Sequence, residues 1–156
     1  MVKYSIIFGL LFLINLSCTT QNKKDTNDNQ VETDIELLRK IINIPFEIDS
    51  ATWQMIGIGK AFDNSYADYL LLAVISSSSF DEKDIEHKSI ESVESFRKDS
   101  TPKWFIDNFG DGFIENEASY VFTGEVYEAD LFYKTMFLQG CYFIQENQIF
   151  LILNTT

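Results

Sequence analysis

The sequence is poor in residues whose side chains bind transition metals or act as strong nucleophiles. It has two cysteines, Cys18 and Cys141, and one histidine, His87. A structural zinc site needs four ligands, usually cysteines and histidines, so this set is too small. The chain also contains no phosphate-binding loop, no dinucleotide-binding loop and no zinc-protease motif. We therefore expect neither a metal nor a cofactor.

Positive charge is scarce as well. The chain has 12 lysine and arginine residues against 24 aspartate and glutamate residues, which gives a net charge of −12. Proteins that bind nucleic acid neutralise its phosphates with a basic face, and anionic lipid headgroups attract basic segments in the same way. The composition therefore predicts that nucleic acid is not a partner and that anionic headgroups do not hold the protein at a membrane.

The chain has no obvious transmembrane helix. An apolar stretch covers residues 5–16, but crossing the hydrocarbon core needs about 20 apolar residues. This stretch follows Lys3 and ends just before the small residue Ser17. A positive start, an apolar core and a small residue before the break are the parts of a secretory signal peptide. The pattern favours a targeting signal over a membrane span.

The order of these parts, Lys3, the apolar core and then Leu16-Ser17-Cys18, resembles that of a bacterial lipoprotein precursor. The resemblance covers only the first eighteen residues. It implies cleavage before Cys18 and attachment of acyl chains such as palmitate to that cysteine, which would anchor the protein to a membrane of the cell envelope. Plain secretion and an uncleaved anchor are the alternatives.

The residues after Cys18 are strongly polar. Residues 19–33 read TTQNKKDTNDNQVET, in which Val31 is the one apolar side chain. Such a segment cannot bury enough surface to offset the entropy lost on ordering, so we expect a flexible tether. The predicted organisation is a signal peptide at residues 1–17, a lipidated tether at 18–33 and one domain at 34–156.

The predicted domain begins with a helix. Residues 33–36, Thr-Asp-Ile-Glu, have the spacing of a capping box, with Thr33 as the N-cap. Ile35, Leu38 and Ile42 then fall on one face, and Pro45 ends the pattern. We expect this helix to cover a sheet.

Two β-rich stretches follow, at residues 52–60 and 69–75. Turn-forming residues 63–65 (Asp-Asn-Ser) separate them, which favours an antiparallel pair. The second stretch, YLLLAVI, is apolar at every position and is therefore predicted to be a central strand buried on both faces.

The second half of the chain is expected to add two helices and further strands. A helix with a modest apolar stripe is predicted over residues 81–98, and a short one from Thr101-Pro102 to Gly110. Further β-rich stretches lie at 119–127, 129–137 and 140–155, with a hairpin turn at Glu146-Asn147. Strands segregated from helices predict an α+β domain with a mostly antiparallel sheet.

Three features that look like active or binding sites have simpler interpretations. Residues 107–115 repeat acids around a glycine like a calcium loop, but Phe109 and Ala118 occupy two ligand positions, so a helix end and a glycine turn are favoured. His87 is expected to face water on the predicted 81–98 helix, and Cys141 to be a buried thiol in a strand. The serines at 76–79 lack nucleophile-elbow glycines and are interpreted as a strand end followed by a helix start.

Carboxylates are the remaining candidates for function. Between Lys103 and Lys134 the chain has seven acids and no lysine or arginine: Asp107, Asp111, Glu115, Glu117, Glu125, Glu128 and Asp130. They are interpreted as a solvated acidic edge, as a surface that docks a basic partner, or as the source of a catalytic pair such as that of a glycosidase.

The sequence therefore predicts a membrane-anchored lipoprotein of the bacterial envelope, periplasmic or surface-facing, that binds rather than catalyses. A basic protein or peptide is the expected partner, as an inhibitory or immunity-type lipoprotein would have. One alternative is a carboxylate-dependent hydrolase. Another is a structural subunit of an envelope assembly, which predicts an exposed aromatic patch at Trp53 or Trp104.

Overall fold

A computed structural model describes residues 30–59, 68–85, 87–90, 95–99, 101–134 and 136–155. The predicted signal peptide, Cys18, most of the predicted tether and the predicted turn at 63–65 lie outside these residues.

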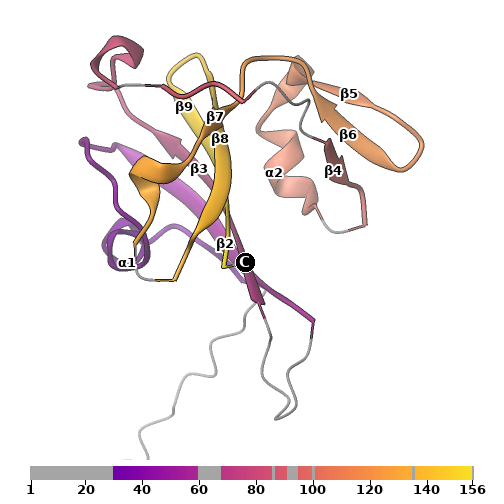
Figure 1. Ribbon diagram of the computed structural model, residues 1–156, viewed down its shortest axis with the longest axis horizontal. Helices are drawn as coiled ribbons and strands as arrows, with labels where there is room; N and C mark the ends of the chain where they lie inside the picture. The colour runs from indigo at the N-terminus through magenta and orange to yellow at the C-terminus, as the bar shows by residue number, and fades with distance from the viewer. Residues whose placement is uncertain are drawn as a thin grey trace, which may run out of the picture.

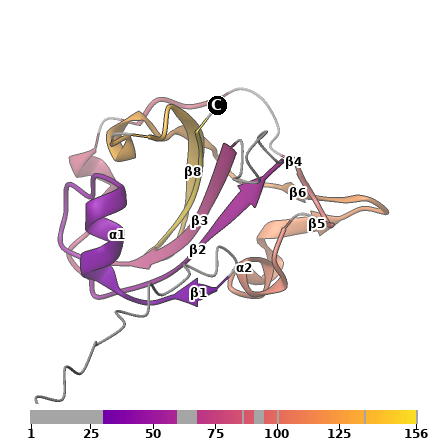
Figure 2. The same ribbon diagram turned by 90° about the horizontal axis from the view of Figure 1, so that it is seen from below.

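The domain is built on one curved antiparallel sheet. Its six strands have the spatial order β1-β2-β3-β9-β8-β7. Their bounds are β1 Val31–Glu32, β2 Ser50–Ile58, β3 Asp68–Ser76, β7 Tyr127–Glu128, β8 Gln139–Gln145 and β9 Gln148–Asn154. Helix α1 (Ile35–Ile41) lies on the concave side of the sheet, as Figures 1 and 2 show.

Both faces of this sheet are buried. In β3, Leu71, Ala73 and Ile75 contribute to an apolar cluster with α1, whereas Leu72 and Val74 contribute to a second cluster on the opposite face. Because successive side chains of a strand point to opposite faces, an apolar residue at every position suits a strand covered on both sides. The prediction of a central, doubly buried strand is confirmed.

A smaller sheet and helix α2 (Lys103–Asp107) cover the second face (Figure 2). The three strands have the order β4-β6-β5, with β4 at Ser95–Arg97, β5 at Phe113–Glu115 and β6 at Ser119–Phe122. Phe109 is fully buried at the centre of the second cluster, where its ring centroid lies 4.0 Å from that of Phe150 and 4.2 Å from that of Phe113. Aromatic packing joins the two sheets.

The expected fold class, α+β, is wrong. The described residues form a predominantly antiparallel β structure whose two α-helices have seven and five residues. The error comes mainly from the predicted 81–98 helix, where the described residues form instead a 3₁₀-helix η1 (Glu82–Asp84), a β-bridge at Ser89 and β4. Residues 88–90 bond to the β7 edge of the main sheet, and β4 pairs with β6 in the smaller sheet. The amide of Ile90 donates to the carbonyl of Val126, and the amide of Glu128 donates to the carbonyl of Lys88.

The other predicted elements are mostly present. Strands β2 and β3 pair antiparallel, and β8 and β9 form a hairpin whose turn contains Glu146 at φ 54°. Helix α1 exists, but its N-cap is Asp34, whose Oδ1 accepts from the amide of Leu37 at 2.9 Å. The predicted strand at 129–137 is wrong, because the 3₁₀-helix η3 (Asp130–Phe132) there turns the chain and buries Phe132.

Candidate functional site

The structure distributes the seven candidate acids over distant parts of the domain. Asp107 ends α2, Asp111 lies in the 3₁₀-helix η2 (Gly110–Gly112), and Glu115 and Glu117 lie at the β5–β6 hairpin. Glu125, Glu128 and Asp130 lie at or near β7 and η3. Figure 1 shows that hairpin and α1, beside which η3 lies, at opposite ends of the molecule. The seven acids therefore do not share one surface.

Lysines of the same chain neutralise three of these acids. Lys103 Nζ lies 2.6 Å from Asp107, Lys98 Nζ lies 2.6 Å from Glu115, and Lys88 bonds to Glu128. The hydrogen bonds to their carboxylates raise the pKa of Lys103 and of Lys88. The other four acids are exposed and have no lysine or arginine within ion-pair distance among the described residues: Asp111, Glu117, Glu125 and Asp130.

An open pocket of about 570 Å³ lies beside one of these four, Asp130. Its walls are loop residues 45–46 after α1, residues 79–81 with Ile85 after β3, and residues 130–131 of η3. We call this the Phe46 pocket. It combines aromatic rings, from Phe46 and Phe80, with the carboxylates of Asp81 and Asp130. No motif in the sequence indicates that Asp81, Phe46 and Phe80 share a site, because these residues are separated in the chain.

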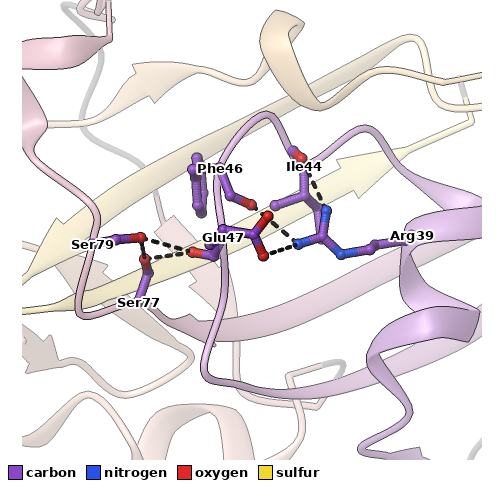
Figure 3. Close-up of polar contacts among 6 residues, drawn as sticks. All are labelled: Arg39, Ile44, Phe46, Glu47, Ser77 and Ser79. Carbon is purple, nitrogen blue, oxygen red and sulfur yellow. Dashed lines mark hydrogen bonds and ion pairs between the residues drawn. The ribbon is translucent and has the colours of Figure 1, made fainter.

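Hydrogen bonds fix two walls of the Phe46 pocket to each other (Figure 3). Ser77 Oγ donates to the carbonyl of Glu47 at 2.6 Å and lies 3.3 Å from Ser79 Oγ. The guanidinium of Arg39 donates to the carbonyls of Ile44 and Phe46 at 3.3 and 3.2 Å. The serine run is thus a strand end, as predicted. The segment after it is not the start of a helix but a loop that is hydrogen-bonded to the loop after α1.

Next to the pocket, His87 lies against two tyrosines. Its Nδ1 is 2.6 Å from the hydroxyl of Tyr142, its Nε2 is 2.5 Å from the carbonyl of Glu82, and its ring centroid is 4.6 Å from that of Tyr127. The prediction that His87 faces water is therefore wrong, because it depended on a helix that does not form. Burial, together with the nearby carboxylates of Asp130 and Glu82, raises the pKa of Tyr142 to about 12.

Two carboxylates meet at the hydroxyl of Tyr127. Glu125 Oε2 lies 2.7 Å and Glu82 Oε1 lies 3.1 Å from this oxygen. Burial and these two hydrogen bonds raise the pKa of Tyr127. A glycosidase needs open space for a sugar between its two acids. Here a phenol occupies the position between them, so this pair gives no support to a hydrolase.

The remaining predicted features are placed clearly. Cys141 is a buried thiol in β8, as expected. Residues 107–115 form a helix end followed by Gly110 at φ 53°, also as expected. The predicted exposure of Trp53 is wrong, since it is 3% exposed and its Nε1 donates to the carbonyl of Asp34. Trp104 is partly buried and donates to Gln54 Oε1 at 2.6 Å.

In the ranges that the structure describes, no three histidine, cysteine or acidic side chains gather as metal ligands. The helices in those same ranges are all too short to cross a bilayer. Comparison with protein-family models, with curated proteins and with solved structures gives no match.

Proposed function

We propose that this protein is a lipid-anchored binding protein of the bacterial cell envelope that captures a basic protein or peptide. The anchor is supported by the resemblance of residues 1–18 to a lipoprotein precursor. Capture in the manner of an inhibitory or immunity-type protein fits a chain with twice as many acidic as basic residues and no catalytic motif.

The observation that best supports this proposal is a set of exposed acidic residues that have no lysine or arginine partner among the described residues. Asp111, Glu117, Glu125 and Asp130 keep their negative charge unpaired by lysine or arginine in the described part of the chain. Exposed charges of one sign attract an oppositely charged partner and increase its rate of association. These four acids, which lie on different parts of the domain, are therefore available to a basic partner.

The proposal predicts salt-sensitive binding of a simple basic probe. Residues 30–156 would be titrated with a decalysine peptide at about 20 mM and about 200 mM salt, because screening shortens the range of exposed charges. We expect the dissociation constant to rise about tenfold or more between the two salt concentrations. Absence of binding at low salt would overturn the proposal.

Charge variants test whether Asp111 and Glu117 contribute to decalysine binding. The double variant Asp111→Lys/Glu117→Lys is expected to weaken decalysine binding several-fold, because it reverses two unpaired charges. The matched control Asp111→Glu/Glu117→Asp keeps the charge and should bind like the wild type. Equal binding by both double variants would exclude these acids from the interaction.

A further inference from the structure

The floor of the Phe46 pocket is aromatic. The ring centroids of Phe46 and Phe80 lie 5.1 Å apart with planes inclined by 58°, and Phe46 also meets Phe132 edge-on at 6.2 Å. Phe46 and Phe80 are only partly buried, so parts of their rings remain accessible to a ligand. The face of an aromatic ring attracts a cation placed within about 6 Å of its centroid.

The rim of the pocket carries two oriented carboxylates. Asp81 Oδ1 accepts from the amide of Lys83 at 3.0 Å, and Asp130 Oδ1 accepts from the amide of Leu131 at 2.9 Å. Each carboxylate is thus held through one oxygen while the other oxygen can accept from a ligand. In contrast to Asp107 and Glu115, neither has an ion-pair partner among the described residues.

The three walls of the pocket are held together before any ligand binds. Ser77 and Arg39 fix the loop that carries Phe46, as described above (Figure 3). The third wall is also fixed, because Asn43 Nδ2 donates to the carbonyl of Leu131 at 2.7 Å and the Asn43 amide donates to the carbonyl of Phe132. A pocket fixed in this way loses little conformational entropy on binding, which favours affinity.

We propose that the Phe46 pocket binds the cationic side chain of an arginine or lysine presented by a basic partner. The cation lies against the rings of Phe46 and Phe80, and its N–H groups donate to the carboxylates of Asp81 and Asp130. The volume of about 570 Å³ is in the range of ligand pockets and also admits the residues that flank the cation. The inference rests on the proposed function and assigns its recognition site, which includes only one of the seven predicted acids.

The direct test uses a glycine-flanked arginine peptide and its citrulline counterpart. Citrulline has the shape of arginine without the charge, so we expect it to bind at least about tenfold more weakly. NMR chemical-shift titration of residues 30–156 would give the affinities and the location. The amides of the loops at 44–47 and 79–85 should show the largest shifts. Equal affinity for both peptides, or shifts confined to other surfaces, would overturn the proposal.

A matched pair of double variants separates the pocket from general electrostatics. Asp81→Asn/Asp130→Asn removes two charges and keeps the Oδ1 acceptors that bond to the backbone, so the fold should persist. Asp111→Asn/Glu117→Gln changes the net charge equally outside the pocket. We expect the first to weaken arginine-peptide binding about tenfold and the second to change it less than twofold. Equal losses would overturn the pocket assignment.

A variant of the aromatic floor tests the ring contact. Phe46→Leu keeps an apolar side chain but removes the ring, and it should weaken binding of the arginine peptide several-fold. Thermal unfolding of each variant would confirm that it is folded. If decalysine still binds but the arginine peptide shows no preference for the pocket, this inference fails and the proposed function stands. If neither probe binds, both fail.

Discussion

His87 Nδ1 and the hydroxyl of Tyr142 lie 2.6 Å apart, which joins the segment after η1 to strand β8. The carbonyl of Glu82 can only accept, so in the neutral imidazole His87 Nε2 carries the proton and Nδ1 accepts from the hydroxyl of Tyr142. Tyr142 is fully buried, so its hydroxyl has no access to solvent as an alternative partner.

Removal of the Tyr142 hydroxyl should therefore destabilise the domain. We expect Tyr142→Phe to lower the free energy of unfolding by about 1 kcal/mol, because His87 Nδ1 loses its donor. Urea unfolding measures the change. Tyr120→Phe is the control, since the Tyr120 hydroxyl has no hydrogen bond within the described ranges, and it should change stability by less than about 0.5 kcal/mol. Equal effects would mean that the His87–Tyr142 bond contributes nothing.

Alkaline pH should unfold the protein through its buried tyrosines. The pKa of Tyr142 is raised from 10.0 to about 12, so its neutral form is preferred in the folded state. Its contribution to the free energy of unfolding is fully present below pH 10 and is lost as pH rises through about 12. The free energy of unfolding, measured from neutral pH upward, should decrease between pH 10 and about 12. The decrease should be less steep in Tyr142→Phe. If spectroscopic titration shows that every tyrosine ionises near its ordinary pKa, this expectation is contradicted.

The brace between the pocket loops can be tested within the serine run. Ser77 is 2% exposed and donates to the carbonyl of Glu47, whereas Ser78 is exposed and its hydroxyl makes no hydrogen bond to the part of the chain that the structure describes. We expect Ser77→Ala to lower the free energy of unfolding by about 1 kcal/mol, because the hydrogen bond between the buried Ser77 hydroxyl and the Glu47 carbonyl is lost. The arginine peptide should also bind more weakly. Ser78→Ala should match the wild type in both measurements. If Ser78→Ala lowers the free energy of unfolding as much as Ser77→Ala does, the bond from Ser77 to Glu47 does not hold the two loops together.

The aromatic cluster around Phe109 should be the most sensitive part of the core. Phe109→Ala is expected to cost about 3 to 5 kcal/mol, because it removes a fully buried ring. Gly112→Ala should also destabilise, by about 1 to 3 kcal/mol, since a Cβ there would lie 2.3 Å from atoms of the Phe109 ring. Chemical denaturation measures both. A double variant Phe109→Leu/Gly112→Ala should recover part of the Gly112→Ala loss if the clash with the ring is its cause.

The predicted lipid anchor has its own test. Cys18→Ala should abolish labelling by a radioactive or clickable fatty acid and leave the precursor uncleaved, because the resemblance to lipoprotein precursors assigns both steps to that cysteine. Immunoblots of membrane and soluble fractions measure processing and location. Efficient cleavage of the variant to a soluble protein would instead indicate ordinary secretion.

Local sequence patterns determined much of the sheet. Strands β2, β3, β8 and β9 were predictable because apolar residues at alternating or successive positions specify a strand and the faces that it buries. Helix α1 was predictable from the helical spacing of Ile35, Leu38 and Ile42, and its cap was misplaced by one residue because Thr33 and Asp34 are both good N-caps.

Tertiary structure decided the rest. The apolar spacing in residues 81–98 is compatible with a helix, yet residues 88–90 bond to the chain at β7 and β4 pairs with β6. These strands offer backbone groups that would otherwise remain unpaired. Likewise, the list of acids gave no indication that Asp107, Glu115 and Glu128 meet lysines. Nor did it indicate that Asp81 and Asp130 share a pocket. The sequence by itself determined composition, charge and local periodicity. Only the fold decided which charges are neutralised and which meet at the rings of Phe46 and Phe80, because those contacts join segments far apart in the chain.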